Sequence, residues 1–195
     1  MNFLSIDTAS KLCSVTLFHE DIFYIEEVMS DDGHTMTLSS LCDKIGRSKI
    51  RDIDFIALSI GPGSYSGLRI SSSFSKGLAL SLNKPIVPIS TFEGMNLHIK
   101  DNDKYYISIY SHRDYAFCQL FNAGKIIGEA KCAKINSMKE HKIYGCDFDD
   151  NININKFIKI NPSSKSIGQI ALNNFSNLVA KKINNIKPLY LEMER

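Results

Sequence analysis

Short apolar runs separated by polar turns open the chain. Residues 3–7 form an apolar run that ends at Asp7, and apolar residues then alternate with Ser14 and Thr16. Alternation with a period of two is typical of a strand with one buried face. The pattern therefore predicts a hairpin, followed by a third strand over 22–28.

The period changes to that of a helix after the polar residues 30–33. The spacing i, i+3, i+4, i+7 predicts a helix that ends at Gly46, with an apolar face made of Leu38, Leu41, Cys42 and Ile45. An unbroken apolar run over 53–60 then predicts a strand that is covered on both faces. The expected order so far is three strands, a helix and a buried strand.

The buried strand leads directly into the loop Gly61-Pro62-Gly63-Ser64-Tyr65-Ser66-Gly67. A helix over 68–82 is expected next, and it is rich in small residues: Ser71, Ser72, Ser73, Ser75, Gly77, Ala79 and Ser81. Such a surface suits the close approach of another helix, and a buried contact within the chain explains it equally well. A strand over 85–89 and a helix that starts at the capping box of Ser90 and Glu93 and runs toward 99 are expected to follow.

The second part of the chain begins after Asp101-Asn102-Asp103, which marks the expected boundary between two lobes. The bias to Asn, Ile and Lys over 151–161 predicts loop and edge strand, and a helix with an apolar stripe follows Ser163 or Ser164. Three strands are expected before it, over 105–110, 115–121 and 125–133. We therefore expect a first lobe over 1–100 and a smaller second lobe over 101–195, whose final helix and tail pack back on the first.

The charge balance limits the function. The 195 residues carry 23 Lys and Arg against 21 Asp and Glu, a formal net charge of +2. So small a charge gives no strong field for holding a polyanion such as tRNA, and a nucleic-acid role would have to be shared with another protein.

Five widely spaced cysteines without a C-x-x-C pair predict reduced, mostly buried thiols rather than a disulfide framework or a zinc ribbon. The first apolar run, 3–6, is too short for a signal peptide, and no run approaches the length of a membrane span. A cytoplasmic protein without membrane association is expected.

The glycine loop at 61–67 is the first candidate for chemistry. A tight turn between a buried strand and a helix can direct backbone donors at a phosphate, although the spacing is not that of a Walker A loop. A turn that only folds the helix back onto the sheet fits the pattern equally well. Asp7 could hold a metal-bound phosphate or bond only its own turn. The candidate nucleotide contacts are Asp7, Thr8, Gly61, Gly63 and Ser64.

Other catalytic patterns are missing from the sequence. The five histidines have no H-x-x-x-H spacing, so no metal site is predicted. There is no G-x-S-x-G elbow, and the scattered Cys and His residues give no reason to pair them as nucleophile and base. The charged cluster His112-Arg113-Asp114 is interpreted as a solvated turn. We therefore expect no catalytic residue and no cofactor of the chain's own.

The residues Gly61-Pro62-Gly63-Ser64-Tyr65-Ser66-Gly67-Leu68-Arg69-Ile70 closely resemble the signature of the TsaB (YeaZ) family, Gly-Pro-Gly-Ser-Phe-Thr-Gly-Leu-Arg-Ile, with two conservative changes. Further matches lie at 7–10, 76–80, 90–93 and 188–191. The resemblance covers most of the first lobe and scattered points of the second. Where the family has Asp-Ala-Arg at the start of the second lobe, this chain has Tyr110-Ser111-His112-Arg113.

The resemblance implies an α/β, two-lobed, actin-like fold of the ASKHA (ribonuclease-H-like) type with a reduced second lobe. It implies a non-catalytic paralogue of TsaD, the transferase that places threonylcarbamoyl on the tRNA adenosine next to the anticodon. The implied partners are a TsaD-like transferase, a TsaE-like ATPase and, through the complex, tRNA. ATP and metal are expected on the partner subunits, and a homodimer is expected when the chain is alone.

In the family, two helices pack against the same pair in TsaD or in a second copy. Carried over to this chain, these are the helices over 34–45 and 68–82. The interface residues that this predicts are Leu38, Leu41, Arg69, Ser72, Ser75, Lys76 and Ala79.

Two other functions remain as alternatives. A small actin-like, nucleotide-dependent phosphotransferase would use Asp7 and the glycine loop, but a glycine-rich phosphate turn after Asp7 and a second phosphate motif are missing. A peptidase, which an old naming of related proteins suggests, would need a metal or nucleophile pattern that the sequence does not contain.

Overall fold

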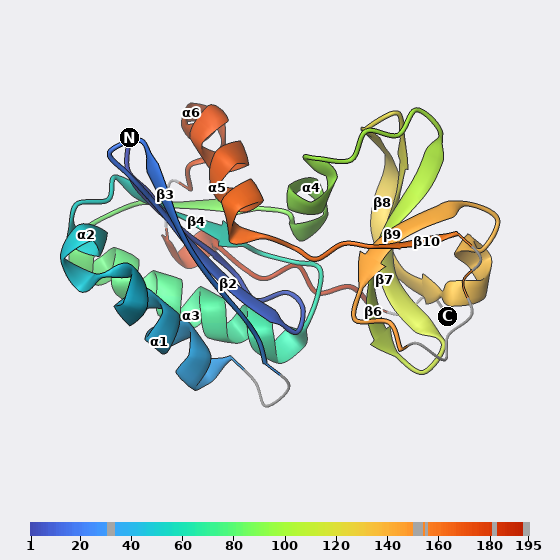
Figure 1. Cartoon of the computed structure of the whole chain (residues 1–195), viewed down its shortest axis with the longest axis horizontal. Coiled ribbons are helices and arrows are strands. Elements are labelled where there is room, and N and C mark those ends of the chain that lie inside the picture. The colour runs from blue at the N-terminus through green and yellow to red at the C-terminus, as the bar shows by residue number, and fades with distance from the viewer. Residues whose placement is uncertain (31–33, 150–153, 155, 181–182, 193–195) are drawn as a thin grey trace.

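Two five-stranded sheets, one at the centre of each lobe, organise the chain in the computed structural model (Figure 1). The structure describes residues 1–30, 34–149, 154, 156–180 and 183–192. β1 pairs antiparallel with β2 and β2 with β3, whereas β4 is parallel to β1 and β5 to β4. In order across the first sheet, the strands are β3 (Ile22–Met29), β2 (Leu12–His19), β1 (Phe3–Asp7), β4 (Phe55–Ser59) and β5 (Ile86–Ile89).

Helices cover both faces of the first sheet (Figure 1). One face carries α1 (Thr35–Ile45), α2 (Arg47–Arg51) and α3 (Tyr65–Leu82), and the other carries α5 (Ser164–Asn173) and α6 (Phe175–Leu178). Because successive side chains of a strand point to opposite faces, Leu4 and Ile6 pack toward α1 and α3, whereas Phe3 packs toward α5. None of the helices in the described ranges is both long and apolar enough to cross a membrane.

The helix α5 lies close against the first sheet. A Cβ added to Gly168 would stand 2.1 Å from Cε2 of Phe3, so a glycine is needed for this approach. At the start of α5, Ser164 Oγ lies 2.7 Å from Ser14 Oγ and 2.7 Å from Thr16 Oγ1 of β2. These hydroxyls attach α5 to the first lobe.

The tail continues along the same lobe. Ala180 N donates a hydrogen bond to Ile86 O at 3.0 Å, and after η2 (Ile183–Asn185) Leu189 N donates one to Ile60 O at 2.6 Å. Ile186 is buried in the core of the first lobe. The described residues of 164–190 therefore pack on the first lobe, although they follow the second lobe in sequence.

The second lobe repeats the strand order of the first. β6 pairs antiparallel with β7 and β7 with β8, whereas β9 is parallel to β6 and β10 is parallel to β9. The five strands thus pair with one another in the same way as β1 to β5 of the first sheet. A single short helix, η1 (Ile135–Met138), stands where the first lobe has α1 and α2. The expected reduced repeat is confirmed. In order across the sheet, the strands are β8 (Lys125–Lys134), β7 (Tyr115–Asn122), β6 (Lys104–His112), β9 (Lys142–Cys146) and β10 (Phe157–Lys159).

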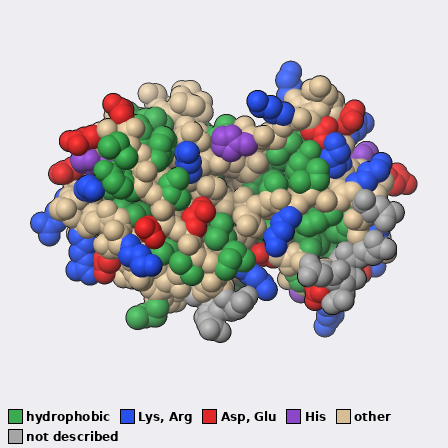
Figure 2. All heavy atoms as spheres, in the orientation of Figure 1, with side chains coloured by type: hydrophobic (Ala, Val, Ile, Leu, Met, Phe, Trp, Pro, Cys, Tyr) green, Lys and Arg blue, Asp and Glu red, His purple; other side chains and the backbone are tan. Residues whose placement is uncertain are grey.

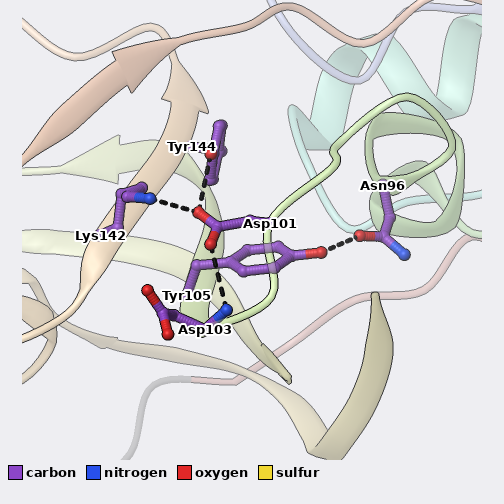
Figure 3. A network of polar contacts seen from close by, with 6 residues as sticks. All are labelled: Asn96, Asp101, Asp103, Tyr105, Lys142 and Tyr144. Atoms are coloured by element: carbon purple, nitrogen blue, oxygen red, sulfur yellow. Dashed lines mark hydrogen bonds and ion pairs between the residues drawn. The ribbon is translucent and has the colours of Figure 1, made fainter. Parts of the chain in front are cut away.

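Polar contacts stabilise the segment that follows α4 (Thr91–Asn96) and crosses from the first lobe to the second (Figure 3). Asp101 Oδ2 accepts hydrogen bonds from Lys142 Nζ at 2.5 Å and from Tyr144 OH at 2.9 Å. Tyr105 OH donates to Asn96 Oδ1 at 2.6 Å, which ties β6 to the end of α4. The crossing segment is thus fixed to the second sheet through Asp101, and the second sheet is in turn tied to α4 through Tyr105.

Most expected elements are confirmed, and the differences lie at helix ends and in two short elements. α3 begins at Tyr65 rather than after Gly67, and α4 ends at Asn96, before the predicted 99. The apolar stripe of the last helix is divided between α5 and α6 at Asn174. The sequence pattern does not predict α2 or β9. β9 is stabilised by parallel pairing with β6, which is distant in sequence and leaves no local signal.

Candidate functional site

The glycine loop and the turn between β1 and β2 pack directly against each other. A Cβ on Gly63 would lie 2.2 Å from Ala9 O, and a Cβ on Gly67 would lie 2.0 Å from Thr8 O. Ser64 N donates to Ala9 O at 2.7 Å, and Thr8 Oγ1 donates to Gly67 O at 2.8 Å. Only glycine permits so close an approach of two backbones. The glycines at these two positions therefore serve a contact within the chain.

Asp7 is buried beneath this contact. It is 0% exposed, and its Oδ1 accepts a hydrogen bond from Ala9 N at 2.9 Å. Its Oδ2 has no hydrogen-bond partner among the residues that the structure describes. Burial raises the pKa of Asp7 to about 6, and the Ala9 amide and the nearby Ser59 hydroxyl offset part of the rise. The carboxyl group is part of the core and is not presented to solvent.

The structure brings the five candidate nucleotide contacts together, but it leaves most of them without accessible surface. Asp7 and Thr8 are fully buried, and Gly61 is buried as well. Gly63 and Ser64 line the cleft between the lobes. The prediction is corrected for Asp7 and Thr8, because a ligand in the cleft cannot reach them without displacing the glycine loop.

A cleft of about 880 Å³ lies between the lobes beside the glycine loop. The first turn of α3 reaches it at Ser64, Tyr65 and Ser66, with Ser64 as the N-cap that accepts from Gly67 N at 3.2 Å. The charged residues around the cleft are of both signs: Lys11, Lys159, Asp147 and Asp149. The charge of the cleft therefore does not favour one class of ligand.

Most helix residues that were expected to meet a partner are core residues. Arg69 is exposed and Lys76 is half-buried, so these two keep surface. The other five are at most 6% exposed because the apolar and small-residue stripe of each helix faces its own sheet. The predicted interface is corrected at these positions, and the alternative of a buried contact within the chain holds for Ser72, Ser75 and Ala79. The five are Leu38, Leu41, Ser72, Ser75 and Ala79.

The outward surface of the same two helices carries exposed apolar side chains. Met36 of α1 is 83% exposed and Leu80 of α3 is 69% exposed. Each helix thus presents one strongly exposed apolar side chain outside its buried stripe. We call this surface the α1–α3 face, marked by Met36, Arg69, Ser73, Gly77 and Leu80.

A hollow of about 350 Å³ lies beside this face, between α3 and the pair α1 and α2. Phe74, Leu78 and Leu82 line it from α3. At its rim, Arg47 donates to both carboxylate oxygens of Asp43, at 2.5 and 2.6 Å. The hollow can receive an apolar side chain of a partner, and the ion pair places polar groups at its edge.

The tail adds an aromatic contact at the start of α3. The ring centroids of Tyr65 and Tyr190 are 4.8 Å apart, and Arg69 Cζ lies 4.2 Å from the centroid of Tyr65. Both rings keep about half of their surface exposed, 54% for Tyr65 and 44% for Tyr190. The sequence pattern does not single out Tyr190, because its contact depends on the return of the tail to the first lobe.

The five cysteines are buried, as expected, and none of them forms a disulfide. Burial raises the pKa of Cys13 and of Cys42 to about 12, and it raises the pKa of Cys146 well above its usual value. Such thiols are rarely ionised and react slowly. Over the described ranges, no three His, Cys, Asp or Glu side chains gather where they could hold a metal ion.

Two lobes with the same strand order, joined at a cleft, define the class of protein: a two-lobed, actin-like α/β protein. Solved structures agree. One from Pseudomonas aeruginosa, described as an uncharacterized protein with similarity to peptidase YEAZ, has a TM-score of 0.77 at 18% identity and covers 98% of this chain and 99% of that one. Another, YeaZ from Pseudomonas aeruginosa, has a TM-score of 0.73 at 19% identity and covers 97% and 99%. At this identity the likeness establishes the fold.

The sequence comparisons match the chain to TsaB and TsaD proteins. The tRNA threonylcarbamoyladenosine biosynthesis protein TsaB of Buchnera aphidicola (subsp. Baizongia pistaciae) is 32% identical over 105 residues, which cover 52% of this chain and 48% of that protein. The family of TsaD, tRNA N6-adenosine threonylcarbamoyltransferase, matches residues 30–112. The transferase of that description from Borreliella afzelii is 31% identical over 135 residues, 68% of this chain and 36% of that protein. The chain spans about half or less of the length of these curated relatives. The chain is thus similar to TsaB proteins over about half of its length and to the TsaD family over 30–112.

Proposed function

We propose that this protein is a TsaB-type subunit required for threonylcarbamoylation of the tRNA adenosine next to the anticodon, without turnover of its own. It scaffolds and activates a TsaD-like transferase in the cytoplasm, together with a TsaE-like ATPase. ATP and metal are held by those partner subunits. The observation that carries the proposal is the α1–α3 face, where Met36 and Leu80 are exposed on helices that the core holds in place.

The α1–α3 face has the composition of a partner-binding surface. Leu80 is exposed on the outward side of α3, where burial of its side chain by a partner would be favourable. A Cβ at Gly77 would meet nothing within 4 Å, so the backbone of α3 is open to close approach there. The match to the TsaD family over 30–112 includes both helices. Paralogues that share two such helices can pair through them.

The proposal also covers a second copy of the chain and tRNA. A second copy of the chain can use it when no transferase is present, because a two-fold axis brings identical helix pairs together. A net charge of +2 is too small to hold tRNA, so tRNA is bound by the complex as a whole. The burial of Asp7 weighs against the alternative of a phosphotransferase, which would need this carboxylate in the cleft.

Depletion of the protein, followed by measurement of threonylcarbamoyladenosine in bulk tRNA by mass spectrometry, tests the proposal. We expect the modified nucleoside to be lost and to return when the wild-type chain is supplied. Met36→Glu combined with Leu80→Glu should fail to restore it and should no longer copurify with the TsaD-like transferase.

Ile126→Glu provides the matched control, because Ile126 is also an exposed apolar residue, at 48%, but lies on β8. This variant should restore the modification. An unchanged level of modified nucleoside after depletion would overturn the proposed function. Full rescue by the double variant would overturn only the assignment of the α1–α3 face and would leave the proposed function standing.

A further inference from the structure

The helix layer made of α1, α2 and α3 is strongly basic. It contains six Lys and Arg residues and a single Asp, whereas the whole chain has a net charge of only +2, so the rest of the chain is net acidic. Figure 2 shows Lys and Arg side chains gathered where α2 and the end of α1 lie, at the left of the view. A local field of this sign attracts an acidic partner. The basic residues are Lys44, Arg47, Lys49, Arg51, Arg69 and Lys76.

Half of these cations already have a partner within the chain. Arg47 is paired with Asp43, and the cationic groups of Lys49 and Arg69 lie on tyrosine rings, at 4.0 and 4.2 Å from the ring centroids. Over the described ranges, no hydrogen bond or ion pair is made by the side chains of the other three. These three are Lys44, Arg51 and Lys76.

Arg51 stands at the rim of the hollow between α3 and the pair α1 and α2. Arg47 and Arg51 are four residues apart, so they lie on the same side of α2, and both line the hollow. Arg47 donates to Asp43 from Nε and Nη2, which leaves the N–H groups of its Nη1 without a described partner. Two guanidinium groups can therefore donate to one carboxylate at this rim.

The floor of the hollow is apolar. Cys42 and Ile50 are 5% and 6% exposed at its base, and Phe74 and Leu78 form its wall on α3. Its volume of about 350 Å³ leaves room for a large apolar side chain, whose burial there would be favourable. Guanidinium groups above an apolar floor match an apolar residue that has a carboxylate beside it.

We propose that the hollow is the docking site for an acidic helix of the TsaD-like transferase. An apolar side chain of that helix enters between α2 and α3, and an Asp or Glu next to it is bound by Arg51 and Arg47. An apolar residue and a carboxylate three or four positions apart on a helix project from the same side, as this arrangement needs. The docking rests on the proposed function, which supplies the partner, and it adds α2 and a requirement for acidic residues to the α1–α3 face.

RNA is the other polyanion that a basic surface attracts. Its phosphate groups would neutralise the cations, but a sugar-phosphate backbone has no apolar side chain to fill the hollow. Met36 and Leu80 on the adjoining α1–α3 face would also remain in contact with water. The combination of positive charge and apolar surface therefore favours an acidic protein over tRNA.

Isothermal titration calorimetry of the full chain with the purified transferase tests the charge requirement. The wild-type affinity should fall by about tenfold from low to high salt, because salt screens attraction across the interface. Arg51→Glu should weaken binding by about tenfold or more, whereas Arg51→Lys keeps the charge and should weaken it by about threefold at most. Lys125→Glu on β8 makes the same change of charge at an exposed lysine of the second lobe, and it should bind like the wild type.

Ser81→Trp tests the hollow itself. Ser81 is exposed and lines the hollow, so an indole ring at this position should fill it and exclude the side chain of the partner. Binding should weaken by about tenfold while the thermal midpoint of the isolated chain stays unchanged. Ser176→Trp on α6, an exposed serine on the opposite side of the first sheet, is the matched control.

A charge exchange identifies the acidic residue of the transferase. Each Asp and Glu on its matching helices is changed to Lys and combined with Arg51→Glu, and one combination should restore binding to within about threefold of the wild type. Such rescue cannot come from a variant that is merely misfolded. Failure of every combination would overturn the docking site.

Three further outcomes would contradict the docking site. A wild-type chain that does not bind the transferase would overturn it together with the proposed function. Wild-type binding that is insensitive to salt, to Arg51→Glu and to Ser81→Trp would overturn the docking site alone. Intact transferase binding by Arg51→Glu, with a lower affinity of the assembled complex for tRNA, would assign the basic layer to RNA instead.

Discussion

Lys142 Nζ lies 2.5 Å from Asp101 Oδ2, and this ion pair joins β9 of the second lobe to the segment that arrives from the first (Figure 3). The Asp101 side chain is 6% exposed, so the carboxylate depends on its partners for solvation. The hydrogen bond from Lys142 lowers the pKa of Asp101, with a further contribution from the Asp103 amide. A lowered pKa means that the ionised carboxylate stabilises the folded state.

Asp101→Asn should therefore lower the thermal midpoint near neutral pH. The contribution of Asp101 is present above the pKa of an unfolded aspartate and is lost as the pH falls through the lower folded pKa. The difference between variant and wild type should shrink in acid. Thermal unfolding near pH 7 and near pH 3 measures this, with Asp103→Asn as the neighbouring control. An equal difference at both values would contradict the assignment.

Asp7→Asn should raise the stability of the folded chain near neutral pH, in contrast to Asp101→Asn. Folding raises the pKa of Asp7 from 3.8 to about 6, so the stability that it contributes is full below pH 3.8 and is lost as the pH rises through about 6. An asparagine keeps the acceptor for Ala9 N but carries no charge. Above pH 6 the variant should be more stable than the wild type, by up to about 3 kcal/mol. Guanidinium unfolding at several pH values measures the difference, which should vanish in acid.

Gly67→Ala should destabilise the chain by about 1–3 kcal/mol, because the new Cβ would stand 2.0 Å from Thr8 O, a backbone atom that cannot move alone. The glycine loop and the turn after β1 would have to separate. Urea unfolding monitored by circular dichroism measures the loss. A variant as stable as the wild type would show that the loop is not held against this turn.

Gly77→Ala is the matched comparison on the same helix. A Cβ there meets nothing within 4 Å, so alanine should stabilise the isolated chain by about 0.5–1 kcal/mol. The added methyl group stands on the α1–α3 face, and copurification with a TsaD-like transferase should fall. Greater stability with weaker partner binding would separate the role of this glycine in association from any role in folding. Unchanged copurification would place Gly77 outside the interface.

The sequence predicts the first lobe well because its elements have strong local periods. Residues 3–7 and 53–60 are apolar enough to indicate buried strands, and both β1 and β4 are entirely buried. β9 has no such signal, since its position depends on pairing with β6 across the second lobe. The start of α3 was misplaced because Gly67 looks like a loop residue, whereas it is a helical glycine in contact with Thr8.

The interface residues chosen from the sequence lie mostly on the core side of the first-lobe helices. The apolar stripe that identifies a helix in a sequence is the stripe that faces the core, so Leu38 and Ala79 are buried. The residues that mark the outer surface, Met36 and Leu80, depart from that stripe. An apolar residue out of phase with the helical period is the signal that could have found them.

The return of the tail to the first lobe has a consequence during synthesis on the ribosome. Phe3 and Phe55 lie under α5, and Ile60 is bonded by Leu189, yet these partners are separated by the whole second lobe. A nascent chain that has reached the end of β5 has all five strands of the first sheet but only one of its two helix layers. The sheet must wait for 164–189 to leave the ribosome before its second face is covered. Premature termination after the second lobe would therefore leave the first lobe open, with its aromatic residues exposed to aggregation.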